Sequence, residues 1–289
     1  MERNPNWAAQ FFLILCPTAA GCFLGSLILD PGGGNRPFVV VCGTVALVCV
    51  VLGAATPVFT IKKPSRSCRF LAGIGHSPLS RQAALVGLFA VLLLIDWILV
   101  LAGVYAFWFG IVAEVVGAAA VLAAGMTYLL GAQPVWRHWS TPLALFGGLL
   151  ALGVSMSLVI ALGWREVVLA GTSGGLAARI LVLVGVAGLA VALGGRAAYL
   201  GRGGQRTEEA RELTRHGYRR THRLTAVLLA VGAAAAAASI ASDWVIIVAF
   251  VALLAGLFAH WRLFFLTATA LSWKAEVQWL TPAPAAGKE

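Results

Sequence analysis

Eight apolar runs, each long enough to cross a membrane, dominate this sequence. They cover approximately residues 8–29, 38–59, 79–104, 107–130, 143–162, 176–200, 224–241 and 245–266. A helix of about 20 apolar residues crosses the roughly 30 Å of hydrocarbon in a bilayer, where lipid offers no partner to an unpaired backbone group. We therefore expect an all-α integral membrane protein, a bundle of eight transmembrane helices. It forms a single domain over residues 1–289 with a polar tail at 267–289.

The charge of the chain is concentrated in particular loops. Only 11% of residues are charged, against 60% hydrophobic, and the net charge is +10. Most of the lysines and arginines follow the second, fourth and sixth apolar runs, which one orientation would place on the same side of the membrane. Because basic loops stay in the cytoplasm, we expect both termini there, and we expect lipid rather than nucleic acid around this chain.

The cysteine and histidine patterns argue against a metal or haem site. The five cysteines include no CxxC pair, and none of the five histidines lies near the centre of an apolar run. An iron–sulfur cluster needs cysteine thiolates, and a membrane haem needs facing imidazoles within the bilayer. We expect no metal ligands, no haem, no iron–sulfur cluster and no catalytic residue on this chain.

Two carboxylates lie inside apolar runs. Asp96 and Glu114 flank Tyr105 symmetrically in the third and fourth runs, so we expect them at similar depth. Ionisable groups inside the membrane are costly, and two carboxylates at one depth could share a proton. A proton relay is one interpretation. The other is that each carboxylate pairs separately, for example with Arg179.

The polar segment between the second and third runs is the first candidate for a site. It reads PSRSCRFLAGIGHSPLSRQ from Pro64 to Gln82, and its two prolines interrupt helical structure at a membrane interface. Arginines there could bind an anionic group, while serine and glutamine could hydrogen-bond a carbonyl. The alternative is that the arginines only orient the chain and contact lipid headgroups.

Three segments resemble the membrane-anchor subunits of the dimethyl sulfoxide reductase family, the DmsC type within the NrfD-like group. PSRSCRFLAGIGHSPLSRQ resembles a family P-x-R-A segment followed by S-x-L-S-R-E. MTYLLGAQPVWRHWSTPL resembles a Tyr, Pro, Trp and Thr-Pro pattern between the fourth and fifth spans. HWRLFFLTAT resembles a family arginine with following aromatics at the end of the last span.

This resemblance implies a non-catalytic subunit of a respiratory oxidoreductase in the cytoplasmic (inner) membrane of a prokaryote. Such subunits anchor a molybdopterin catalytic subunit and an iron–sulfur subunit, carry no molybdopterin themselves, and in many members bind a quinone or quinol, such as menaquinone, that exchanges electrons with the iron–sulfur subunit. The quinone-binding candidates that the resemblance and the polar segment together suggest are Arg66, His76, Ser80, Arg81, Gln82, Tyr128, Trp136 and Arg262.

The sequence departs from the family pattern at two positions. Family members often have a histidine where this chain has Thr60, and a glutamate where it has Gln82. Both family residues titrate, and neither replacement does, so a purely structural anchor that has lost its quinone site is an alternative function. A small-solute transporter is a third hypothesis, against which we find no internal repeat. The substrate of the complex and the direction of electron flow stay open.

Overall fold

A computed structural model describes residues 7–60, 78–129, 138–169, 173–202 and 218–280. Every regular element within these ranges is helical, and they contain no strand. Eight helical spans are long and apolar enough to cross a membrane. The prediction of an all-α bundle of eight transmembrane helices is therefore confirmed.

The spans follow one another in up-and-down order. The bounds are α1 Trp7–Leu29, α2 Arg36–Thr60, α4 Pro78–Leu101, α5 Phe107–Leu129, α8 Ser173–Arg202, α10 Arg219–Ala238 and α11 Val245–Leu280. The fifth span is divided into α6 Ser140–Gly148, the π-helical η3 Leu149–Gly153 and α7 Val154–Ala161, followed by η4 Leu162–Trp164 and η5 Arg165–Leu169. Helix α10 begins before the apolar run at 224, and α11 continues well past 266 into the expected polar tail.

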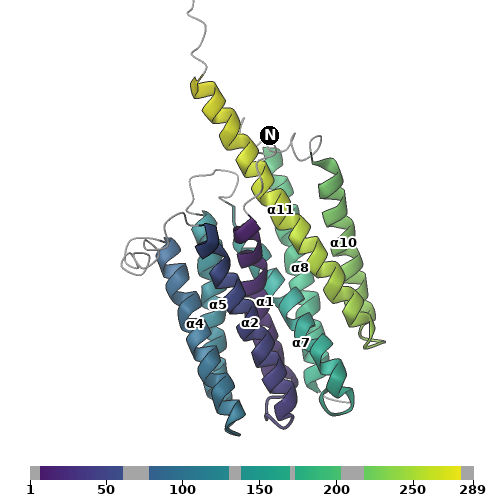
Figure 1. Ribbon diagram of the computed structural model, residues 1–289. Coiled ribbons are helices and arrows are strands. Elements are labelled where there is room, and N and C mark those ends of the chain that lie inside the picture. Colours follow the sequence, from purple (N-terminus) through teal and green to yellow (C-terminus); the bar gives the residue numbers. More distant parts are fainter. Residues whose placement is uncertain (1–6, 61–77, 130–137, 170–172, 203–217, 281–289) are drawn as a thin grey trace, which may run out of the picture.

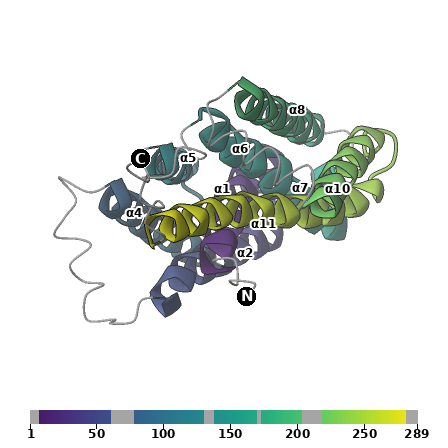
Figure 2. The ribbon, with the colours of Figure 1, turned by 90° about the horizontal axis from the view of Figure 1, so that it is seen from above.

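The alternation of spans gives the bundle two different ends (Figure 1). We call one the basic end: α1, α4, α6 and α10 start there, and it carries the loops in which the sequence concentrates lysine and arginine. We call the other the short-turn end, because only a few residues join α1 to α2, α4 to α5 and α10 to α11 there. Seen from above, α11 runs obliquely across the bundle (Figure 2), and it contacts α1, α7 and α10.

Helix α1 is the central element. In its apolar window 83% of residues are buried, against 28% in α4, α8 and α10. It packs against α2, α5, α7, α8 and α11, which leaves little of its surface exposed. Its hydroxyl groups are satisfied within the helix: Thr18 Oγ1 donates to the Ile14 carbonyl at 2.7 Å, and Ser26 Oγ to the Phe23 carbonyl at 2.7 Å.

Small residues bring α1 and the fifth span into backbone contact. Gly21 lies against η3, where an added Cβ would overlap the Leu149 carbonyl oxygen. A Cβ on Gly153 would lie 2.5 Å from the Gly21 Cα atom, and one turn further on Gly25 faces Ser157. Two small residues four positions apart on each helix allow this approach, which maximises van der Waals contact where hydrophobic burial gives no advantage over lipid.

At the short-turn end, the first turn of the chain is tied to the turn between α4 and α5. The Asp30 carboxylate accepts hydrogen bonds from the backbone N–H groups of Gly34 (2.9 Å) and Asn35 (2.6 Å). The Tyr105 hydroxyl donates to the Asp30 carbonyl oxygen at 3.0 Å. Gly33 adopts φ +62° directly against the Tyr105 ring, where a Cβ has no room. The hairpin of α4 and α5 is thereby fixed to α1 and α2.

We predict that Gly21→Ala destabilises the bundle by about 1–3 kcal/mol, because the added methyl group forces α1 away from η3. Gly87→Ala in α4 is the matched control, since nothing lies within 4 Å of a Cβ at that position. It should be neutral or stabilise the helix by up to about 1 kcal/mol. Thermal unfolding in detergent, followed by circular dichroism, measures both. Equal melting temperatures for the two variants would contradict the packing described here.

Candidate functional site

The predicted quinone residues divide into buried and exposed groups. Ser80 and Gln82, in the first turns of α4, are 2% and 6% exposed. Arg81 between them and Arg262 on α11 are exposed. Three further candidates lie outside the described residues: Arg66, His76 and Trp136. Among the members of the predicted set that the structure describes, only Ser80 and Gln82 are buried polar residues.

The pairing of α4 with α5 brings these residues near Tyr128. Gly117 faces Phe89, and a Cβ on Gly110 would lie 3.7 Å from Asp96 Oδ1. Continued to the basic end, the same antiparallel register sets Ser80 and Gln82 beside residues 124–126, within one turn of Tyr128.

The ring of Tyr128 in turn packs edge-on against two aromatic rings of α11. Its centroid is 5.8 Å from that of Phe264 and 6.0 Å from that of Phe265. Tyr128 is half-buried in this position. An aromatic wall thus lies between α5 and α11 close to the buried polar groups of α4.

Two buried amide atoms at the basic end have no hydrogen-bond partner among the described residues. They are Gln82 Oε1, an acceptor on α4, and Gln10 Nε2, a donor on α1. Gln10 is 1% exposed. Leaving a buried polar group unpaired costs about 1–3 kcal/mol, so each is a candidate for contact with a bound molecule. Gln10 was missed in the sequence, because nothing in an apolar run shows which side of the helix faces inward.

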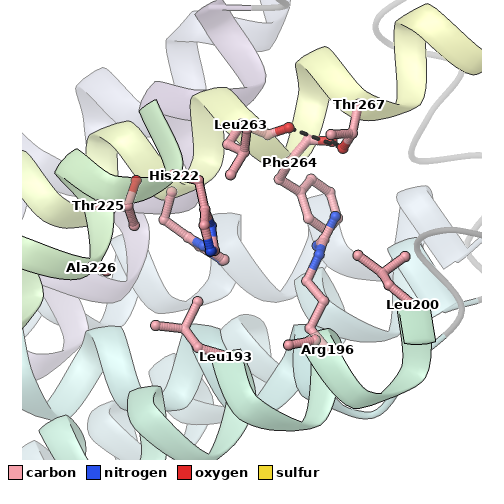
Figure 3. A pocket seen from close by; sticks show the side chains of 11 residues that line it. Leu193, Arg196, Leu200, His222, Thr225, Ala226, Leu263, Phe264 and Thr267 are labelled. Atoms are coloured by element: carbon pink, nitrogen blue, oxygen red, sulfur yellow. Dashed lines mark hydrogen bonds between the residues drawn. The ribbon is translucent and has the colours of Figure 1, made fainter. Parts of the chain in front are cut away.

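A pocket of about 320 Å³ opens between α8, α10 and α11 at the basic end (Figure 3). Its polar lining consists of Arg196, His222, Thr225, His260 and Thr267. Its apolar lining consists of Leu193, Ala197, Leu200, Ala226, Leu263 and Phe264.

Arg196 and His260 are the most buried basic side chains in the lining of this pocket. The Arg196 Cζ atom lies 4.4 Å from the centroid of the Phe264 ring, a cation–π contact. His260 is 7% exposed. Neither side chain makes a hydrogen bond or ion pair within the described part of the chain. The sequence offers a weak signal for this pocket, because Arg196 falls among the arginines that set orientation and the pocket histidines, His222 and His260, are considered there only as haem ligands.

The two intramembrane carboxylates lie in the half of the bundle nearer the short-turn end. Asp96 faces Gly110, and Glu114 is one helical turn further along α5. Both are buried, and Glu114 Oε2 has no hydrogen-bond partner among the described residues. Asp96 follows Ser80 by 16 residues of α4, or about 24 Å along the helix axis. The proton relay stays a prediction, and its position separates it from the polar groups at the basic end.

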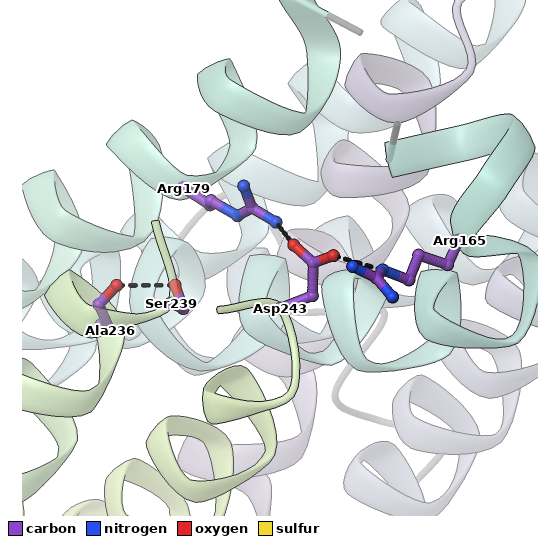
Figure 4. Close-up of polar contacts among 5 residues, drawn as sticks. All are labelled: Arg165, Arg179, Ala236, Ser239 and Asp243. Atoms are coloured by element: carbon purple, nitrogen blue, oxygen red, sulfur yellow. Dashed lines mark hydrogen bonds and ion pairs between the residues drawn. The ribbon is translucent and has the colours of Figure 1, made fainter. Parts of the chain in front are cut away.

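Arg179 pairs with a carboxylate other than these two. Asp243, in the turn between α10 and α11, accepts hydrogen bonds from Arg179 of α8 and from Arg165 Nε of η5, the latter at 2.6 Å (Figure 4). Burial raises the pKa of the Asp243 carboxyl, but the Arg165 hydrogen bond and the charges of Arg179 and Arg165 outweigh burial, so the pKa lies below its ordinary value. This ion-pair cluster links η5, α8 and the turn between α10 and α11 at the short-turn end.

Comparison with protein families gives one result for this chain. The model of the DMSO reductase anchor subunit family (DmsC) matches residues 1–275. The chain belongs to the DmsC family. No protein with curated annotation matches it.

Membership of the DmsC family, together with the eight apolar helices, makes this chain a multi-pass membrane anchor subunit of a DMSO reductase-type complex. The family implies partner subunits that carry the catalytic site and the iron–sulfur clusters. Among the described residues, no group of three or more histidine, cysteine or acidic side chains is arranged to hold a metal ion.

We predict that Asp243→Asn lowers the melting temperature at pH 7 and that the difference disappears in acid. Because the folded pKa of Asp243 is depressed, its ion pairs stabilise the protein above the unfolded pKa of about 4 and are lost as pH falls through the lower folded value. Melting temperatures of wild type, Asp243→Asn, Arg179→Gln and the double variant between pH 7 and pH 3 measure this. A deficit that is the same at every pH would show that the variant acts through packing rather than charge.

Proposed function

We propose that this DmsC-family subunit binds a quinone or quinol at the basic end of the bundle and passes electrons between it and the iron–sulfur subunit. The single observation that carries the proposal is the buried, unpartnered Oε1 atom of Gln82, which lies in a segment where the family resemblance expects the quinone site. The basic end is then the cytoplasmic face, by the charge of its loops, and the membrane is the inner membrane of a prokaryote.

The residues at this end include the hydrogen-bonding groups and aromatic rings that a quinone site needs. A bound quinone supplies two-electron, two-proton redox chemistry. Gln82 Oε1 can accept a hydrogen bond from a quinol hydroxyl, and the Nε2 atom of Gln10 can donate one to a quinone oxygen. Tyr128 with Phe264 and Phe265 offers an aromatic wall for a flat ring.

Proton exchange at this site has to use groups near the basic end. Asp96 is about 24 Å from Ser80 along α4 and cannot reach a ligand held there. We therefore keep Asp96 and Glu114 as a proposed relay for protons on the short-turn side. Arg66, His76, Arg81, Trp136 and Arg262 remain proposed contributors at the basic end. His76 is the titratable member of that group.

The second candidate function is a structural anchor without quinone turnover. The neutral side chains of Thr60 and Gln82, which stand where the family often has histidine and glutamate, favour it. In that case the chain would hold the catalytic and iron–sulfur subunits at the membrane while electrons enter or leave elsewhere. The two functions differ in one measurable step, electron exchange with quinol.

We predict that Gln82→Leu slows quinol-dependent reduction of the partner's iron–sulfur clusters about tenfold, because one hydrogen bond to the ligand, worth about 1.5 kcal/mol, is lost. Assembly with the partner subunits should not change. The measurement is stopped-flow mixing of the purified complex with a soluble quinol, followed by electron paramagnetic resonance of the clusters.

Thr127→Val is the matched control. Thr127 lies on α5 at similar depth, and its hydroxyl donates to the Ala123 carbonyl of its own helix at 2.9 Å, so we expect normal exchange. Wild-type complex that assembles but shows no exchange would support the structural anchor. Exchange that Gln82→Leu leaves untouched would move the quinone site away from α4.

A further inference from the structure

The pocket between α8, α10 and α11 contains positive charge that the described residues do not balance. Arg196 is half-buried with its guanidinium over Phe264, and His260 lines the same cavity while nine-tenths buried. His222 completes the cluster from α10 (Figure 3). Holding a guanidinium partly out of water is costly without an anion nearby, so the cavity is suited to a negatively charged group.

Among the side chains in the described part of the chain, the carboxylates lie far from this pocket. The carboxylates whose surroundings the structure describes are Asp30, Asp96, Glu114 and Asp243, and all of them lie toward the short-turn end. Arg179 and Arg165 use Asp243 there. Just outside the apolar span, burial and then the charge of Arg196 lower the pKa of His138.

The pocket lies where the apolar spans of α8, α10 and α11 reach the basic end, and part of its lining is exposed. Ala197 on α8 and His222 and Ala226 on α10 are exposed at its rim. Arg219 and Arg220, also exposed, stand in the first turn of α10. Tyr218 at the N-cap makes no side-chain hydrogen bond to the helix, so the N-terminal N–H groups add to the positive potential.

We propose that this pocket binds the phosphate of an acidic phospholipid headgroup. Arg196 and the imidazoles of His260 and His222 supply the donors. The hydroxyls of Thr225 and Thr267 already donate to backbone carbonyls of their own helices at 2.9 Å. The apolar walls at Leu193, Leu200 and Leu263 suit the start of an acyl chain, which a free phosphate ion would leave uncovered. Basic pockets between transmembrane helices are a known setting for anionic lipid headgroups.

The proposal does not depend on quinone exchange, because its donors are Arg196, His260 and His222 rather than Gln82 and Gln10, although both sites share Phe264 of α11. Native mass spectrometry of the delipidated complex, titrated with phosphatidylglycerol or with phosphatidylcholine of the same acyl chains, tests it. The wild type should retain one phosphatidylglycerol at about a tenfold lower concentration than phosphatidylcholine. Arg196→Gln should lose this preference. Arg223→Gln, which removes an equal charge from an exposed position of α10 outside the pocket lining, should keep it.

A second measurement on the wild type covers the case in which Arg196→Gln does not fold. Phosphatidylglycerol with a photoreactive group near the top of its acyl chain should label peptides spanning residues 193–200 and 260–267. Labelling elsewhere, or equal labelling by the phosphatidylcholine analogue, would overturn the proposal. Displacement of the label by millimolar inorganic phosphate would show a site for a free anion instead, and displacement by a menaquinone analogue would show a quinone site.

Discussion

The backbone contact between α1 and the fifth span is the constraint on which the rest of the bundle depends. In lipid, apolar side chains gain little by leaving one hydrocarbon environment for another, so helices associate through close van der Waals contact. Gly21 and Gly25 on one side, with Gly153 and Ser157 on the other, make that contact possible. The π-helical turn of η3 occurs at this crossing. The other spans then pack around α1, which explains why most of its residues are buried.

Among the side chains that the structure describes, the carboxylates and the pocket arginine Arg196 lie toward opposite ends of the bundle. At the short-turn end, Asp243 joins two arginines from different elements into a closed cluster. At the basic end, Arg196 finds an aromatic ring but no carboxylate among the described residues. Phe264 lies between the two proposed ligand sites, because it contacts both Arg196 and Tyr128. A change in the position of α11 would therefore reach both the lipid pocket and the aromatic wall of the quinone site.

Part of the candidate site could be read from the sequence and part could not. Gln82 and Tyr128 belong to segments that resemble a known family, and the structure buries the first and packs the second against aromatics. Arg196 and His260 are separated by more than sixty residues; His260 begins the HWRLFFLTAT segment, but Arg196 stands in none of the three segments that resemble the family. Only the side-by-side packing of α8, α10 and α11 brings them together. Gln10 shows the same limit, since the sequence around a single amide in an apolar run does not show whether its side chain faces the protein or the lipid.

The sequence by itself determined that this chain forms eight membrane helices. That information is local: a run of about 20 apolar residues can satisfy its backbone in lipid only as a helix. Tertiary structure alone decided which helix is central and which polar groups face inward. The physical reason is that these spans are apolar on every side, so no periodic pattern marks an inner face. The role of a glycine in helix packing, or of a buried polar atom in a site, can be recognised only when the neighbouring helix is known.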